Sequence, residues 1–131
     1  MTRIVHVNGD YLPEAEARVS VFDRGFLMAD GVYEVTSVLD GKLIDFAGHC
    51  ARLARSLSEL EMTNPHSDVE WLDLFRQMVT RNAIVDGMIY LQFRQAAVQP
   101  RAMPGKVDQL AVQHRRHLIH PIGHQKPPVK H

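Results

Sequence analysis

Two hydrophobic patterns alternate along the N-terminal two thirds of the chain. In the first, apolar and polar residues alternate or β-branched residues are dense, which predicts strands at residues 4–7, 11–12, 32–39, 43–44 and 88–91. Asn8-Gly9 and Asp40-Gly41 each separate two of these runs, and Asp86-Gly87 precedes the last one. Such dipeptides favour tight turns, so the pattern predicts hairpins near the start and the middle of the chain.

In the second pattern, apolar residues recur every three or four positions, which is typical of a helix with one buried face. This spacing predicts a first helix with an apolar face made of Phe46, Cys50, Leu53, Ala54, Leu57 and Leu60. Asp45 is the expected N-cap. The helix should end before Asn64-Pro65, because proline disfavours helical geometry in the residue that precedes it.

A second helix is predicted to begin at Ser67. The Ser67 hydroxyl and Glu70, three residues later, have the spacing of a capping box. The helix that follows carries an apolar stripe of Trp71, Leu74, Phe75 and Met78. Strands combined with these helices predict an α+β fold, in which helices pack on one face of an antiparallel sheet.

The chain has 131 residues, enough for one domain with a hydrophobic core. Its 15 basic residues balance 15 acidic ones, so neither nucleic acid nor an anionic membrane is an expected partner. Cys50 is the one cysteine, and the sequence shows neither a secretory leader nor an apolar run long enough to cross a bilayer. These features predict a cytoplasmic protein.

The pattern changes after Gln92. Residues 93–131 contain most of the prolines and histidines and few sustained hydrophobic runs, although residues 107–112 predict a short strand. We therefore expect a patterned domain at residues 1–92 and a divergent Pro- and His-rich tail at residues 93–131. Four histidines of this tail are close in sequence, but no Cys, Asp or Glu accompanies them, so no metal site is predicted at His114, His117, His120 and His124.

The segment VFDRGFLMADGVYEV, residues 21–35, combines turn-forming and ionisable residues with the start of a strand. Gly25 and Gly31 predict two sharp turns that need backbone conformations unfavourable for other residues. Asp23 and Arg24 are expected to hold the loop by hydrogen bonds to neighbouring backbone groups. The segment would then place Tyr33 at the edge of a cavity beside the sheet, although a half-buried strand aromatic has the same pattern.

On the first predicted helix, His49, Arg52, Ser56 and Glu59 form a polar stripe along the edge of the apolar face. A guanidinium in this place is suited to bidentate binding of a phosphate. Arg52 is also suited to salt bridges on a solvated flank, because Glu59 lies nearby in sequence. Spacing alone favours the solvated flank over the phosphate site.

Taken together, these segments resemble the class IV pyridoxal-phosphate enzymes. VFDRGFLMADGVYEV is similar to their N-terminal signature, and its ADGVYEV part is closest to the D-amino-acid aminotransferase branch. The resemblance extends over VNGDYLPEAEARVSVFDRGF, the helical HCARLARSLSEL and GMIYLQ at residues 87–92, in that order. It implies the small N-terminal domain of a two-domain enzyme.

This resemblance also implies a function and a set of site residues. The family uses pyridoxal 5'-phosphate to transfer an amino group from an amino acid to a 2-oxo acid, and its members form homodimers. Tyr33 and Val35 take the positions of substrate contacts, and Arg52 takes the position of the arginine that binds the cofactor phosphate. D-amino acids are the favoured substrates. Branched-chain aminotransferase and aminodeoxychorismate lyase activities are the alternatives within the family.

The covalent centre of the family has no counterpart in this sequence. Class IV enzymes attach the cofactor to a lysine of their large domain, and the attached amine also moves a proton during the reaction. The lysines of this chain all lie in other sequence contexts, at Lys42, Lys106, Lys126 and Lys130. No catalytic residue is therefore assigned.

A second departure begins after Gln92. The resemblance implies a Thr-Arg-Gly or Ser-Arg-Gly step there, but the sequence continues FRQAAVQPRAMPG. Neither Arg94 nor Arg101 has the expected spacing, and neither is assigned to the site. We therefore expect a truncated or out-of-frame C-terminal region. A non-catalytic remnant is the alternative from a different class of function.

Overall fold

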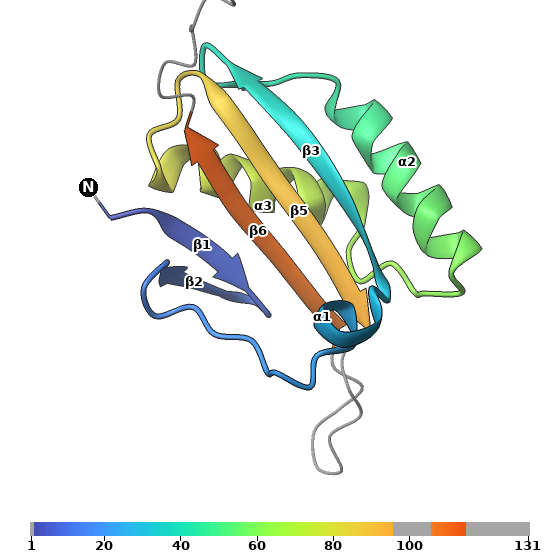
Figure 1. The fold of residues 1–131 in the computed structure, drawn as a ribbon. Helices are drawn as coiled ribbons and strands as arrows, with labels where there is room; N and C mark the ends of the chain where they lie inside the picture. The colour runs from blue at the N-terminus through green and yellow to red at the C-terminus, as the bar shows by residue number, and fades with distance from the viewer. Residues whose placement is uncertain (1, 96–105, 115–131) are drawn as a thin grey trace, which may run out of the picture.

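The computed structural model describes residues 2–95 and 106–114. Within these ranges the chain forms one six-stranded sheet with strand order β2-β1-β6-β5-β3-β4 (Figure 1). The strands are β1 (Ile4–Val7), β2 (Asp10–Pro13), β3 (Gly31–Leu39), β4 (Lys42–Leu43), β5 (Gly87–Gln95) and β6 (Lys106–His114). All neighbouring strands are antiparallel.

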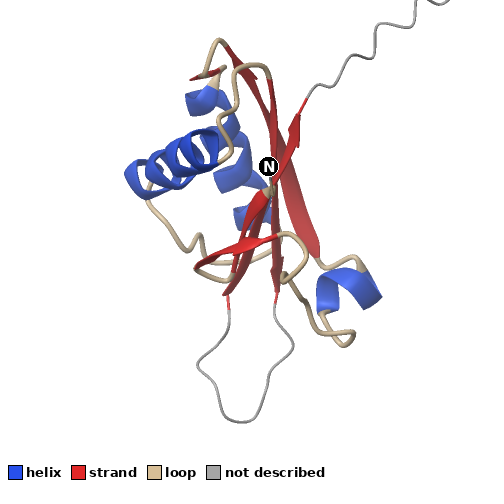
Figure 2. Cartoon of the chain, turned by 90° about the vertical axis from the view of Figure 1, so that its left-hand side faces the viewer, coloured by secondary structure: helices blue, strands red, loops and turns tan. Residues whose placement is uncertain are grey.

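The helices are α1 (Arg24–Met28), α2 (Phe46–Glu59) and α3 (Asp68–Arg81). The two long helices cover one face of the sheet, whereas the short α1 lies on the opposite side, near one end of the strands (Figure 2). The expected α+β fold, an antiparallel sheet with helices packed on one face, is confirmed. The sequence did not predict α1. No helix in the described ranges is long and apolar enough to span a membrane.

The hydrophobic core lies between the sheet and the two long helices. The sheet contributes Val38, Ile89, Leu91 and Phe93, and the helices contribute Cys50, Leu53, Leu57, Trp71, Phe75 and Met78. Burial of each large apolar side chain stabilises the fold by about 1.5–3 kcal/mol. The apolar faces predicted for both helices therefore form this core, except that Ala54 and Leu60 are exposed.

The predicted turns and one of the two predicted caps are confirmed. Positive φ angles of 53° and 97° at residues 8 and 9, and of 51° and 70° at residues 40 and 41, are those of tight hairpin turns. Ser67 and Glu70 form the predicted capping box at the start of α3. Asp45 occupies the predicted N-cap position of α2, but with a φ of 51° its side chain makes no cap hydrogen bond.

Gly25 and Gly31 are required for a reason other than the predicted turns. Neither has a positive φ angle, and the left-handed position at the end of α1 is occupied by Ala29, with a φ of 52°. A Cβ atom on Gly25 would lie 2.3 Å from Cδ of Arg94, and a Cβ atom on Gly31 would lie 2.6 Å from the carbonyl oxygen of Phe93. Both glycines therefore leave space for the close approach of β5.

The sheet continues beyond Gln92. β5 extends to Gln95, and β6 lies between β1 and β5 as a central strand. The strand predicted at residues 107–112 is thereby confirmed, and it is longer than predicted. The expected division at residue 92 does not coincide with the end of the sheet. Several residues weighed from the sequence lie outside the described residues: Arg101, His117, His120, His124, Lys126 and Lys130.

One edge of the sheet is open along most of β3. β4 pairs only with Val38 and Leu39, at the end of β3. Along residues 31–37, β3 pairs with β5 on one side and has no strand partner on the other among the described residues. The candidate site lies along this open edge.

Candidate functional site

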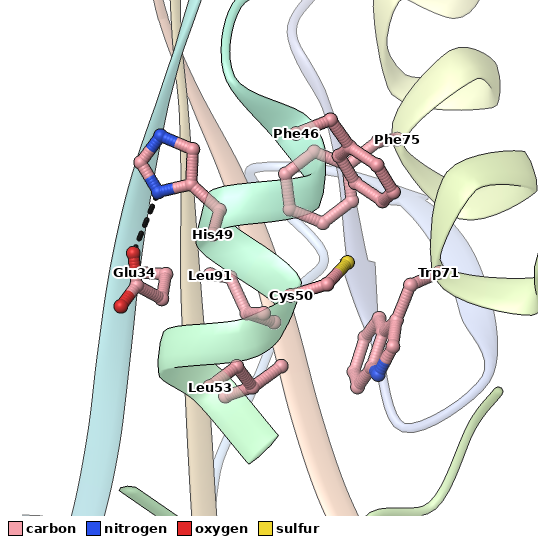
Figure 3. Close-up of a pocket in the computed structure, with 8 residues that line it drawn as sticks. All are labelled: Glu34, Phe46, His49, Cys50, Leu53, Trp71, Phe75 and Leu91. Carbon is pink, nitrogen blue, oxygen red and sulfur yellow. Dashed lines mark hydrogen bonds and ion pairs between the residues drawn. The ribbon is translucent and has the colours of Figure 1, made fainter. Parts of the chain in front are cut away.

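Glu34 of β3 meets His49 and Arg52 of α2 in one polar cluster. Nδ1 of His49 lies 2.6 Å from Oε2 of Glu34 (Figure 3). Oε1 of the same carboxylate lies 3.5 Å from Nε of Arg52, and Nη2 of Arg52 lies 2.8 Å from Nδ1 of His49. The Glu34 and His49 side chains are 14% and 16% exposed, against 44% for Arg52. A largely buried carboxylate and imidazole thus lie behind a guanidinium that reaches solvent.

The local structure explains why these side chains meet. Side chains alternate along a strand, so Glu34 lies on the helix-covered face together with the buried Thr36 and Val38. His49 and Arg52 are three residues apart and therefore lie on the same side of α2. A carboxylate at the border of an apolar layer requires partners to offset its desolvation, and the helix supplies two.

Asp45 is a second acidic residue beside Arg52. Its Oδ2 lies 3.8 Å from Nη1 of Arg52, and its side chain is 63% exposed. The cluster therefore combines one guanidinium and one imidazole with two carboxylates, of which only that of Glu34 is largely buried. Of the three guanidinium nitrogens, Nε faces Glu34 and Nη2 faces His49, whereas Nη1 has Asp45 as its acidic neighbour.

A small apolar cavity lies directly behind the cluster. Glu34 and His49 border it, and the rest of its wall comes from α2, α3 and β5: Phe46, Cys50, Leu53, Trp71, Phe75 and Leu91 (Figure 3). Burial, followed by the negative charges of Asp68 and Glu34, raises the pKa of the Cys50 thiol to about 11. The thiol is therefore protonated at neutral pH, and Cys50 has the properties of a core residue and not of a nucleophile.

Tyr33 and Val35 lie on the other face of β3. The Tyr33 side chain stacks on Tyr90 of β5, with ring centroids 5.6 Å apart and an interplanar angle of 15°. Tyr33 is 64% exposed, so it is not the half-buried aromatic of the alternative interpretation. Tyr33 and Arg52 flank the open edge of β3 from its two faces, and neither borders the small cavity behind the cluster.

Asp23 and Arg24 stabilise the structure around α1. Asp23 accepts a hydrogen bond from the backbone N–H of Phe26 at 3.0 Å and caps α1. The same oxygen, Oδ1, lies 3.0 Å from Nη1 of Arg94, and both side chains of this ion pair are almost fully buried. Nε of Arg24 donates to Asp30 at 2.8 Å near the surface. The predicted hydrogen bond to a neighbouring backbone group is confirmed for Asp23, whereas Arg24 holds the loop through the Asp30 side chain.

Sequence reasoning missed Glu34 and gave His49 no role. The signal for Glu34 was present, because strand alternation places it on the same face as the core residues Thr36 and Val38. An acidic residue at such a position indicates a polar partner on the covering helix. Arg94 was not assigned to the site, and the structure places it under α1, away from the Glu34 cluster.

Comparison with known proteins identifies the family. Residues 31–130, which is most of the chain, match the family described as amino-transferase class IV. The protein is a class IV aminotransferase family member. This match includes the open edge of β3 and the cluster of Glu34, His49 and Arg52. It continues past Gln92, where the sequence pattern had changed.

Curated relatives of this class IV chain are D-alanine aminotransferases. The protein from Staphylococcus haemolyticus is 38% identical over 88 residues, which cover 67% of this chain and 31% of that protein. The protein from Listeria monocytogenes is 34% identical over 97 residues, covering 74% of this chain and 34% of that protein. The class IV chain thus spans about a third of the length of the curated relatives that it matches.

Solved structures show the same fold. The branched-chain aminotransferase from the thermophilic archaeon Thermoproteus uzoniensis, solved with norvaline, matches with a TM-score of 0.73 over 87% of this chain and 41% of that chain, at 19% identity. The Escherichia coli branched-chain amino acid aminotransferase gives a TM-score of 0.76 over 87% of this chain and 41% of that chain, at 18% identity. At this level of sequence identity, the likeness shows only that these proteins share a fold.

Proposed function

We propose that the protein is a pyridoxal-phosphate-dependent aminotransferase that acts on D-amino acids and 2-oxo acids, and that the described residues form one side of its active site. The observation that carries this proposal is the half-exposed Arg52 guanidinium at the open edge of β3, in a chain 38% identical to a D-alanine aminotransferase. That identity is the reason to prefer D-amino acids to branched-chain substrates. A cytoplasmic location is part of the same proposal.

The residues at the β3 edge fit the phosphate end of the cofactor. Arg52 is 44% exposed and presents two terminal nitrogens, the geometry that suits phosphate oxygens. Its Nε faces Glu34, so the guanidinium is fixed from behind while its outer side is accessible. When bound, pyridoxal phosphate supplies the electron sink through which an amino group passes from an amino acid to a 2-oxo acid.

Tyr33 and Val35 form the substrate side of the proposed site. Tyr33 is held by its stack on Tyr90, and both Tyr33 and Val35 lie on the face of β3 opposite to Arg52. Bound at this edge, the cofactor would be held at its phosphate by Arg52, and the substrate would contact Tyr33 and Val35. The edge strand would thereby separate phosphate binding from substrate binding.

We do not assign the covalent attachment of the cofactor to the described residues. Lys42 is exposed on β4 and borders neither the cavity nor the cluster of Glu34, His49 and Arg52. We propose that the attaching lysine belongs to the part of the protein that corresponds to the remaining length of the curated relatives.

Replacing Arg52 tests the phosphate role. We expect Arg52→Ala to weaken binding of pyridoxal phosphate by about tenfold or more, because a hydrogen bond between charged groups contributes roughly 1.5–3 kcal/mol. Affinity is measured by equilibrium dialysis at low ionic strength, with the cofactor detected by its absorbance.

Arg55→Ala is the matched control. Arg55 lies on the same helix, is 71% exposed and forms only a surface ion pair with Glu59 at 4.0 Å among the described residues. This variant removes the same charge without changing the β3 edge, so its cofactor affinity should equal that of the wild type. Equal affinities for all three proteins would contradict the assignment of Arg52.

We further propose that the protein forms homodimers through the region of α1. The exposed apolar side chains there are Val21, Phe22, Phe26, Leu27 and Met28, each more than half exposed. Exposed apolar side chains gathered in this way favour association.

We expect Phe26→Asp to shift the protein from dimer to monomer in sedimentation velocity. Val69→Asp, at an exposed position of α3, should leave the dimer intact. A monomeric wild-type protein at high micromolar concentration would contradict this proposal.

A further inference from the structure

The contacts of His49 contain a conflict of hydrogen-bond roles. Nδ1 lies 2.6 Å from Oε2 of Glu34 and 2.8 Å from Nη2 of Arg52. A ring nitrogen either carries a hydrogen, which it donates, or has a free lone pair, which accepts. The Glu34 carboxylate only accepts and the Arg52 guanidinium only donates. Nδ1 can therefore form a hydrogen bond with one of these two partners and not with both.

Distance and burial favour Glu34 as the partner of Nδ1. The contact with Glu34 is the shorter one, at 2.6 Å against 2.8 Å for the contact with Arg52, and each contact joins the ring to one ionised group. Glu34 is only 14% exposed, so its carboxylate gains little from water. With the hydrogen on Nδ1, Glu34 uses one oxygen for His49 and turns the other toward Nε of Arg52 at 3.5 Å.

This arrangement leaves both terminal nitrogens of Arg52 without an acceptor among the described residues. Nη2 faces the N–H group of His49, which offers it no acceptor. Nη1 has the Asp45 carboxylate as its nearest acidic neighbour in the described ranges, at 3.8 Å, which is longer than a hydrogen bond. The Arg52 side chain is 44% exposed, and its terminal N–H groups therefore lack acceptors within the described part of the chain.

We propose that Glu34 is the positioning residue of the phosphate site. By taking the Nδ1 hydrogen of His49 and holding the Nε side of Arg52, it keeps Nη1 and Nη2 free for two oxygens of the cofactor phosphate. Without this carboxylate, Nδ1 of His49 becomes an acceptor for Nη2, and Arg52 turns toward α2. The inference rests on the phosphate role proposed above for Arg52.

The test uses the whole 131-residue chain with ¹⁵N-labelled histidine and inorganic sulfate as the probe. Sulfate keeps its charge across neutral pH, and the ¹⁵N shifts of the ring show which nitrogen carries the hydrogen. In the wild type we expect the hydrogen of His49 on Nδ1. Glu34→Leu removes the acceptor of the Nδ1 hydrogen, so we expect it to move this hydrogen to Nε2. We also expect it to weaken sulfate binding about fivefold, the equivalent of roughly one hydrogen bond, even though the removal of a negative charge alone would favour an anion.

Asp45→Asn is the control, because it also removes a carboxylate beside Arg52. It should leave the hydrogen on Nδ1 and should not weaken sulfate binding. A wild-type His49 without a hydrogen on Nδ1 would overturn the proposal, and so would a folded Glu34→Leu variant that binds sulfate as tightly as the wild type. The wild-type measurement needs no substitution, so it decides the first point even if the variant does not fold.

The outcomes also separate this proposal from the proposed function. If Arg52→Ala leaves the affinity for pyridoxal phosphate unchanged, while Glu34→Leu moves the ring hydrogen and weakens sulfate binding, the cofactor role fails and the positioning role stands. If Arg52→Ala weakens cofactor binding but Glu34→Leu has neither effect, the positioning role alone is overturned.

Discussion

Asp23→Ala should lower the free energy of unfolding by about 3–5 kcal/mol, which is the usual cost of leaving one buried charge without its partner. Asp23 is paired with Arg94 at 3.0 Å, and the two side chains are 6% and 4% exposed. Nε and Nη2 of Arg94 already lack a hydrogen-bond partner among the described residues. The substitution would leave the whole guanidinium unpaired, and it would also remove the cap of α1. Urea denaturation followed by circular dichroism measures the loss.

The neighbouring residue provides the control for this prediction. Arg24→Ala breaks an ion pair with Asp30 whose side chains are 47% and 23% exposed, so it should cost no more than about 1 kcal/mol. The double variant Asp23→Ala/Arg94→Met should recover much of the stability lost in Asp23→Ala, because no buried charge remains. Equal losses in the free energy of unfolding for Asp23→Ala and Arg24→Ala would show that the buried ion pair stabilises the fold no more than the exposed one.

Gly31→Ala should also destabilise the fold strongly, by roughly 3 kcal/mol, the upper range for forcing extra atoms into a packed site. The new Cβ would lie 2.6 Å from the carbonyl oxygen of Phe93, and a backbone atom within a sheet has little freedom to move. β3 and β5 would separate at the Gly31–Arg94 pair, close to Tyr33 and Glu34. The urea midpoint should fall, and the stack of Tyr33 on Tyr90 should loosen, which near-ultraviolet circular dichroism detects.

Gly48→Ala is the matched substitution. Its Cβ would lie 2.4 Å from Oδ2 of Asp45, but that carboxylate is exposed and can turn away. Alanine also favours a helix over glycine by about 1 kcal/mol. We therefore expect Gly48→Ala to be neutral or slightly stabilising. Similar losses at Gly31 and Gly48 would mean that the contact with Phe93 does not determine the cost.

Local rules were sufficient for most elements of the fold. The turns at Asn8-Gly9 and Asp40-Gly41, the capping box at Ser67 and the apolar faces of α2 and α3 follow from residues that are neighbours in sequence. Asp45 shows the limit of such rules. An acidic residue before a helix suggests a cap, but here it adopts a left-handed conformation and lies near Arg52 instead.

Features that depend on contacts between distant segments were not predictable in the same way. Gly25 and Gly31 looked like turn residues, yet they are needed because β5 passes close by, and only the sheet register shows this. The partner of Asp23 is 71 residues away, so its burial had no local signal. For the same reason the sequence indicated Arg52 and Tyr33 separately, but not that Glu34 holds Arg52 from the helix-covered face of β3.

The position of β6 has a consequence for biosynthesis. Of the described strands, β6 is the last to leave the ribosome, yet it is the one that joins the N-terminal hairpin of β1 and β2 to the β5-β3-β4 half of the sheet. Pairing across such a sequence separation carries a large loop-closure cost and slows folding. Until β6 emerges, both halves present unpaired strand edges, so the nascent chain passes through a stage that is prone to aggregation and open to chaperones.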